Sequence, residues 1–128
     1  MKYLLDTHVF LWIIEDNPNL TERVKDIYLA NSNDIFLSVA SIWEMSIKIS
    51  LKKLKIKGLL NRFVDKHVLG NNIRFLEISE QHVFPIAKLP FYHRDPFDRL
   101  LVSQCIEEKM DLISGDRIFD KYDVKRIW

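Results

Sequence analysis

The sequence of 128 residues has few residues that cross-link or interrupt a chain, with one cysteine, three glycines and four prolines. The single thiol, Cys105, excludes an intrachain disulfide, so we expect a fold held together by its core in the reducing environment of the cytoplasm. With 48% hydrophobic and 29% charged residues, this composition is typical of a folded globular protein and excludes a disordered chain.

The chain also lacks a large excess of positive or negative charge, because its 19 Lys and Arg residues and 18 Asp and Glu residues give a net charge of +1. An RNA or anionic membrane partner therefore has to meet a local patch. Long apolar runs are absent too, since Asp6 and His8 interrupt the apolar start and no small-residue cleavage site follows. We expect neither a signal peptide nor a membrane span. The length, without internal repeats, predicts a single domain over residues 1–128.

What the sequence does contain is an alternation of short apolar runs and amphipathic segments. The apolar runs predict strands at 2–6, 34–39, 73–78, 111–114 and 124–128. The amphipathic segments and their caps predict helices at 7–16, 22–31, 40–53, 59–69, 79–89, 95–110 and 116–122. Strands separated by helices favour an α/β fold with a parallel sheet covered on both faces.

Four acidic residues fall where such a sheet gathers functional groups, beyond the carboxyl ends of its strands. Asp6 ends the first strand and Asp116 follows the fourth by two residues. Glu44 lies early in the helix after the second strand. Asp98, in the first turn of the helix before the fourth strand, joins them only if the loop at 91–94 starts that helix near the same edge.

Clustered carboxylates repel one another unless a cation lies among them. Oxygen ligands without competing Cys or clustered His favour Mg²⁺ or Mn²⁺. The chemistry that such a centre serves best is phosphodiester hydrolysis by an activated water.

Each of these acids also has a simpler structural interpretation. Asp6 and Asp116 are suited to capping the helices that follow them. Glu44 is suited to a surface ion pair with Lys48, and Asp98 to the third position of a capped helix. No single residue decides between the interpretations, but one topology brings all four to one edge.

Four segments of the sequence, LLDTHVFLW, SVASIWEMSIK, HRDPFDRLLVSQ and LISGDRIFDKY, resemble the four consecutive motifs of the PIN domain in the form carried by VapC-type toxins of bacterial toxin–antitoxin pairs. The resemblance covers nearly the whole chain. It implies a three-layer α/β/α sandwich with a central, mainly parallel sheet. It also implies an Mg²⁺- or Mn²⁺-dependent ribonuclease centre whose catalytic and metal-binding acids are Asp6, Glu44, Asp98 and Asp116.

The same resemblance gives expectations for neighbouring residues and for partners. The hydroxyls of Thr7 and Ser114 stand beside the first and fourth acids, where they could orient a carboxylate or a water. Asp95 falls on the cap position of the third motif and is not one of the acids. The family implies an RNA substrate such as tRNA, a cognate antitoxin that reaches into the site, and a homodimer.

A basic run leads away from Glu44 and comprises Lys48, Lys52, Lys53, Lys55 and Lys57. It could follow RNA phosphates, or it could be a solvated helix end whose lysines favour the helix dipole, and the sequence supports both equally.

We expect structural roles for the other side chains that could bind a ligand or a metal, namely the histidines, two tryptophans and Arg99. The four histidines are scattered without metal-ligand spacing, so we expect core or surface positions for them. Trp12 and Trp43 lie on apolar helical faces and are expected in the core, and Arg99 is expected in a structural ion pair.

The leading hypothesis is therefore a metal-dependent endoribonuclease that is the toxin of a toxin–antitoxin pair. One alternative is a non-catalytic PIN-like module that binds RNA or protein, although such a module has no need to keep four acids. Another is a phosphatase with an aspartyl nucleophile, suggested by Asp6 directly after the first strand. That chemistry usually requires a second Asp two residues later, where this sequence has His8.

Overall fold

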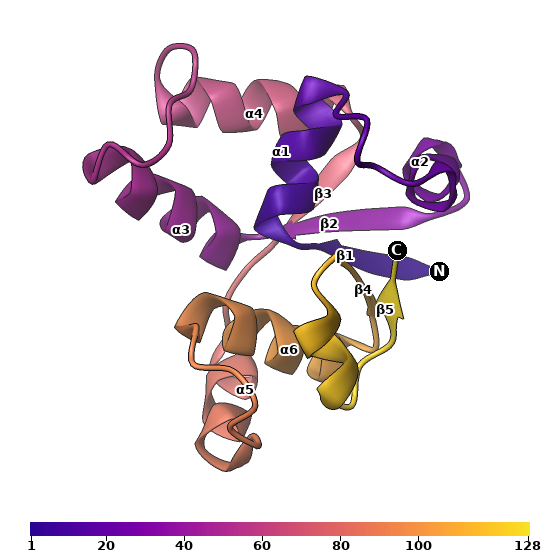
Figure 1. The fold of residues 1–128 in the computed structure, drawn as a ribbon, viewed down its shortest axis with the longest axis vertical. Coiled ribbons are helices and arrows are strands. Elements are labelled where there is room, and N and C mark those ends of the chain that lie inside the picture. The colour runs from indigo at the N-terminus through magenta and orange to yellow at the C-terminus, as the bar shows by residue number, and fades with distance from the viewer.

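The computed structural model describes residues 1–128 and is built around a five-stranded, entirely parallel sheet with the strand order β3-β2-β1-β4-β5 (Figure 1). The strands are β1 (Lys2–Leu5), β2 (Asp34–Ser38), β3 (Ile73–Leu76), β4 (Asp111–Ile113) and β5 (Arg126–Ile127). The α-helices are α1 (Thr7–Glu15), α2 (Glu22–Leu29), α3 (Val39–Ser50), α4 (Leu60–Gly70), α5 (Glu80–Val83) and α6 (Pro96–Glu108). Two 3₁₀ helices complete the chain, η1 (Phe84–Lys88) and η2 (Arg117–Lys121).

Helices cover both faces of the sheet. Side chains alternate between the two faces along each strand, and apolar residues on both faces need a covering layer. In β1, Tyr3 and Leu5 join the core beneath α1 and α4, whereas Leu4 joins a second core with α6. Figure 1 shows α1 and α4 on one side of the sheet and α5 and α6 on the other. The predicted three-layer α/β/α sandwich with a parallel sheet is confirmed. No helix combines the length and the apolar character that a bilayer crossing requires.

Side-chain caps start the helices close to the predicted positions. Asp6 accepts a hydrogen bond from the His8 N–H at the start of α1, and Ser38 accepts one from the Ala40 N–H at the start of α3. Asp6 directly follows β1 and Ser38 is the last residue of β2, so α1 and α3 begin at the carboxyl edge of the sheet. Asp95 accepts from the first turn of α6, with Pro96 at the first helical position, as predicted.

The segment 79–89, expected to be helical with a distortion at Pro85, consists of two short pieces, α5 and η1. Pro85 lies at the start of η1, because proline has no N–H to continue the hydrogen bonds of α5. The strands predicted at 73–78 and 124–128 are shorter than expected, at 73–76 and 126–127.

Two side-chain predictions are wrong. Arg99 forms no ion pair; it is buried and donates hydrogen bonds to the carbonyls of Pro90 (2.9 Å) and Leu89 (3.2 Å). The guanidinium offers several donors from one side chain, which suits two neighbouring loop carbonyls. Trp43 is 56% exposed and packs edge-on against Phe97, because α3 buries Ala40 and Met45 together with Ser41 and Glu44 and leaves Trp43 outside that buried face.

Candidate active site

The structure brings the four predicted acids into one cleft of about 570 Å³ at the carboxyl edge of the sheet. The side chains of Asp6, Glu44, Asp98 and Asp116 all line it, although they come from four separate segments of the chain. The loop before α6 does start that helix near the edge, which was the condition for including Asp98. The residues that line the cleft lie where β1 and β2 pass into α1 and α3 and at the start of α6. Figure 1 shows how these elements are arranged.

Asp6 is held by hydrogen bonds to both of its carboxylate oxygens. Oδ1 accepts from the His8 N–H at 3.1 Å and Oδ2 from the Ser114 hydroxyl at 2.7 Å. Burial works against ionisation of this side chain, but the hydrogen bonds from His8 and Ser114 outweigh it and hold the pKa of Asp6 below its ordinary value. Asp6 therefore enters the cleft as a carboxylate.

Ser114 joins the ends of β1 and β4 at this point. Its hydroxyl donates to Asp6 and accepts from the Asp116 N–H at 3.0 Å, and the side chain is fully buried. Asp116 in turn caps η2 by accepting from the Ile118 N–H at 3.0 Å, and the residue is exposed. The expectation that Ser114 stands against an acid agrees with these contacts.

Glu44 is only 6% exposed, and its Oε2 accepts from the Lys48 ammonium at 3.1 Å. The predicted i to i+4 ion pair is thus present, but it lies inside the cleft and not on the outer surface. Thr7 lies elsewhere than expected, because its hydroxyl donates to Ser41 at 2.8 Å in a buried contact. Thr7 therefore ties α1 to α3 and contacts no carboxylate.

The surroundings of Asp98 disfavour its ionised form, in contrast to those of Asp6. Burial raises its pKa to about 7, the charge of Asp95 adds to the rise, and a hydrogen bond from His93 opposes it. His93 Nε2 lies 2.7 Å from Asp98 Oδ2. A bound cation would favour the ionised form of this buried carboxyl group and so offset the rise in its pKa.

A group of donor atoms that suits a divalent ion lies at the Asp98 and Asp116 side of the cleft, and it does not include Asp6 or Glu44. His93, Asp98 and Asp116 each offer one ligand atom, and these three atoms lie within 4.8 Å of one another. Carboxylate oxygens suit Mg²⁺ and Mn²⁺, and an imidazole nitrogen favours Mn²⁺ over Mg²⁺. This role for His93 was not predicted from the sequence, because its position five residues before Asp98 matches no regular ligand spacing; the fold of the loop at 89–94 creates the contact.

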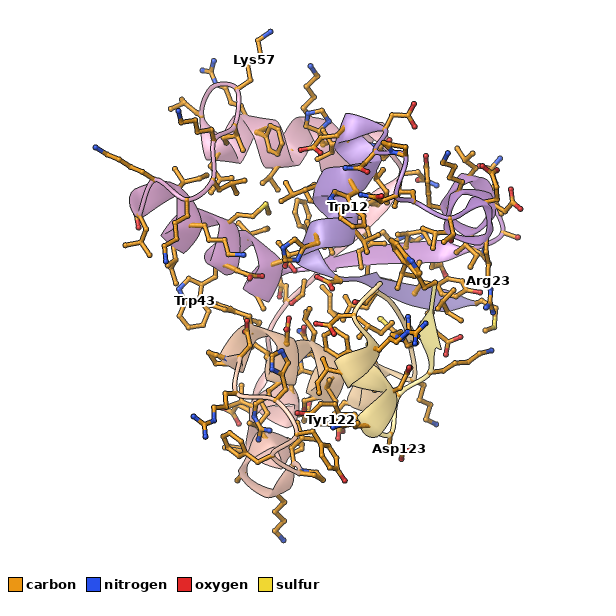
Figure 2. All side chains as sticks on the ribbon, viewed as in Figure 1. Trp12, Arg23, Trp43, Lys57, Tyr122 and Asp123 are labelled. Carbon is orange, nitrogen blue, oxygen red and sulfur yellow. The ribbon has the colours of Figure 1, made fainter.

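The rim of the cleft also contains residues that the sequence patterns did not single out as functional. Trp12 was predicted in the core, yet it is only partly buried and lines the cleft together with Trp128. Trp43, by contrast, lies well apart from Trp12 on the outer side of α3 (Figure 2). Periodicity alone cannot distinguish the two tryptophans, because each lies on an apolar stripe of its helix.

Comparison with known proteins decides the family, because residues 3–125 match the PIN domain. The chain belongs to the PIN domain family. The resemblance predicted from the four sequence motifs is confirmed. No curated protein is significantly similar to this PIN domain in sequence.

Several solved structures share the fold of this PIN domain. VapBC2 from Rickettsia felis bound to a promoter DNA fragment has a TM-score of 0.75 and 19% identity, over 99% of this chain and 98% of that one. DNA-bound VapBC from Salmonella typhimurium has a TM-score of 0.70 and 15% identity, over 99% of this chain and 97% of that one. FitAcB from Neisseria gonorrhoeae has a TM-score of 0.66 and 18% identity, over 98% of this chain and 96% of that one. At such identities the likeness establishes the fold.

Proposed function

We propose that this PIN domain is a metal-dependent endoribonuclease and the toxin of a toxin–antitoxin pair. The observation that carries the proposal is the meeting of four acids from separate segments in one cleft at the carboxyl edge of the sheet. The PIN family match and the likeness to VapBC and FitAB complexes support a toxin nuclease as the class.

In the proposed mechanism, Asp6, Glu44, Asp98 and Asp116 hold Mg²⁺ or Mn²⁺, with His93 as a further ligand. When bound, the ion supplies Lewis acidity, which lowers the pKa of water and offsets the charge that builds on the phosphate. Ser114 keeps Asp6 ionised and oriented through the 2.7 Å hydrogen bond. Lys48, which lines the cleft, offers a positive charge to the RNA phosphate once it leaves Glu44.

The phosphatase alternative has little support at position 8. That chemistry usually requires a second aspartate there, and this position is a histidine whose side chain is 64% exposed.

The test of catalysis is RNA cleavage in the presence of Mn²⁺ by two isosteric variants, Asp98→Asn and Asp116→Asn. We expect each to reduce the cleavage rate at least about 100-fold, because changing even a residue that only orients a metal ligand typically costs roughly 10–100-fold. Asp65→Asn, an exposed position on α4, is the matched control and should cleave like the wild type. Full activity in both site variants, with circular dichroism showing the native fold, would overturn the proposal; absence of Mn²⁺ binding by calorimetry would favour the non-catalytic module.

We also propose that residues 1–128 form a single PIN domain that acts in the cytoplasm on structured RNA such as tRNA. Its proposed protein partners are a cognate antitoxin and a second copy of the chain. The exposed apolar side chains Trp43, Val83 and Phe91, which line a groove beside α3 and α6, support a protein partner. Light scattering of the purified chain, alone and after co-expression with a small protein from the adjacent reading frame, tests both partners.

A further inference from the structure

Two tryptophans form one wall of the acidic cleft. Trp12 projects from α1 and Trp128 follows β5, and their ring centroids lie 5.8 Å apart with the planes inclined by 50°. Both side chains are partly buried and line the same cleft as Asp6 and Asp116. An aromatic surface therefore lies directly beside the carboxylates.

The wall is held in place by the core and by a glycine. Both tryptophans pack against the apolar core beneath α1. A Cβ atom at Gly115 would lie 3.2 Å from the Trp128 ring, so the absence of a side chain there lets the indole lie against the backbone next to Asp116. The ring is thus positioned before any ligand arrives, which lowers the entropic cost of stacking on it.

A nucleotide has two parts that match the two sides of this cleft. The acids and their metal would take the phosphate, and a flat base attached to it would meet an aromatic surface. Single-stranded RNA is commonly bound by stacking bases on such side chains. The volume of about 570 Å³ lies within the range of roughly 300–1,000 Å³ typical of small-ligand sites.

We propose that Trp12 and Trp128 form a base-stacking subsite for a nucleotide next to the cleaved phosphate. The inference rests on the proposed ribonuclease function and adds to it a subsite that positions one base of the substrate. Asn19, exposed at the same wall, offers an amide donor and acceptor to the edge of the stacked base. The subsite thus adds selection of a base to an otherwise sequence-independent phosphate centre.

The kinetic test compares Trp128→Leu with Trp128→Phe, using a short RNA that contains the cleaved bond. Loss of stacking should raise KM about 10-fold and leave kcat nearly unchanged, and phenylalanine should restore most of the loss. Phe84→Leu is the control, because this aromatic side chain is 70% exposed and lies outside both the cleft and the groove beside α3 and α6. An unchanged KM in the folded Trp128→Leu protein would overturn the subsite.

RNA substrates that lack the base beside the cleaved bond show whether Trp128 stacks on that base or only stabilises the fold. Removing the base beside the cleaved bond should raise KM about 10-fold for the wild type and have no further effect on Trp128→Leu. Equal effects on both proteins would contradict the proposal. If Trp128→Leu does not fold, Trp12→Leu with Trp12→Phe replaces it in both experiments.

A binding measurement tests the subsite independently of cleavage. If no RNA is cleaved, the proposed ribonuclease function fails, but this measurement still shows whether the two tryptophans stack on a base. In a Trp43→Phe background, fluorescence excited at a wavelength that only tryptophan absorbs comes from Trp12 and Trp128 alone. A short single-stranded RNA with Mn²⁺ should quench this fluorescence, and the same chain without bases should not. Absence of quenching by the intact RNA at saturating binding would overturn the subsite.

Discussion

At the scale of single residues, the acids of the cleft serve the fold and the site at once. Asp6 and Asp116 cap α1 and η2 and also line the cleft, and Glu44 keeps its ion pair with Lys48 inside it. The capping and the catalytic interpretations of the sequence therefore do not exclude each other. A cap fixes the direction of a carboxylate, and that direction is what a metal centre needs.

The two aspartates of the segment RDPFD should separate in their effects. Asp95→Asn retains the cap, because asparagine accepts the same hydrogen bonds, so we expect a loss of at most about 1 kcal/mol in unfolding free energy and nearly full activity. Asp98→Asn should lose the reaction. Urea denaturation and RNA cleavage of both variants measure the difference; equal losses of activity would show that the roles are assigned wrongly.

The raised pKa of Asp98 predicts a pH-dependent cost in the metal-free protein. Folding raises this pKa from 3.8 to about 7, chiefly by burial, so the folded state binds the proton more tightly than the unfolded chain. The resulting stability is complete below about pH 4 and is lost as the pH rises through 7. In EDTA, the stability of Asp98→Asn relative to the wild type should therefore increase by on the order of 2–4 kcal/mol between pH 5 and pH 8. Urea denaturation tests this, and a difference that stays constant with pH would contradict it.

At the scale of elements, the helices and strands could be predicted well from the sequence because caps and periodicity are local signals. Asp6, Ser38 and Asp95 each mark a helix start, and the first two lie at the ends of strands, which places α1 and α3 at the functional edge. The path of the loop at 84–94 was not predictable. Arg99 and His93 shape it through contacts set by tertiary packing, and no short-range pattern encodes them.

Arg99 should be essential for this loop. Arg99→Ala leaves the carbonyls of Leu89 and Pro90 without donors and removes the guanidinium from the face of Phe91, 4.0 Å away. We expect a loss of about 2 kcal/mol or more in unfolding free energy. Arg99→Lys should restore little of it, because an ammonium cannot reach the carbonyls in the same fork. Urea denaturation and limited proteolysis of the 84–94 segment measure both effects, and a lysine variant as stable as the wild type would contradict the argument.

At the scale of the whole molecule, a nearly neutral chain has an uneven charge distribution. Residues 48–67 contain seven basic residues and one acidic residue, whereas the rest of the chain contains 12 basic and 17 acidic residues. In this segment Lys48 alone forms an ion pair, while Lys52, Lys53, Lys55 and Lys57 are exposed without one. Lys57 lies at the tip of the connection between α3 and α4, at the edge of the molecule (Figure 2). The role of this basic run stays a prediction, because its exposure fits both phosphate binding and a solvated helix end.

Neutralising the four exposed lysines to glutamine should weaken RNA binding without changing the cleaved sequence. The slope of log affinity against log salt should become shallower by roughly 0.7 for each phosphate that the variant no longer neutralises. A variant with Lys2, Lys88, Lys109 and Lys121 changed to glutamine removes the same amount of charge elsewhere. Filter binding at several salt concentrations compares the two; equal effects would show that net charge alone, and not this run, attracts RNA.

The most direct test of the central claim is metal-restored cleavage. RNA ends are sequenced after incubation with EDTA-treated protein, before and after addition of excess Mn²⁺, for the wild type and for Asp116→Asn. We predict new RNA ends only after Mn²⁺ is added, and only with the wild type. Cleavage that persists in EDTA, or that Asp116→Asn performs equally well, would contradict a metal-dependent centre built on the four acids.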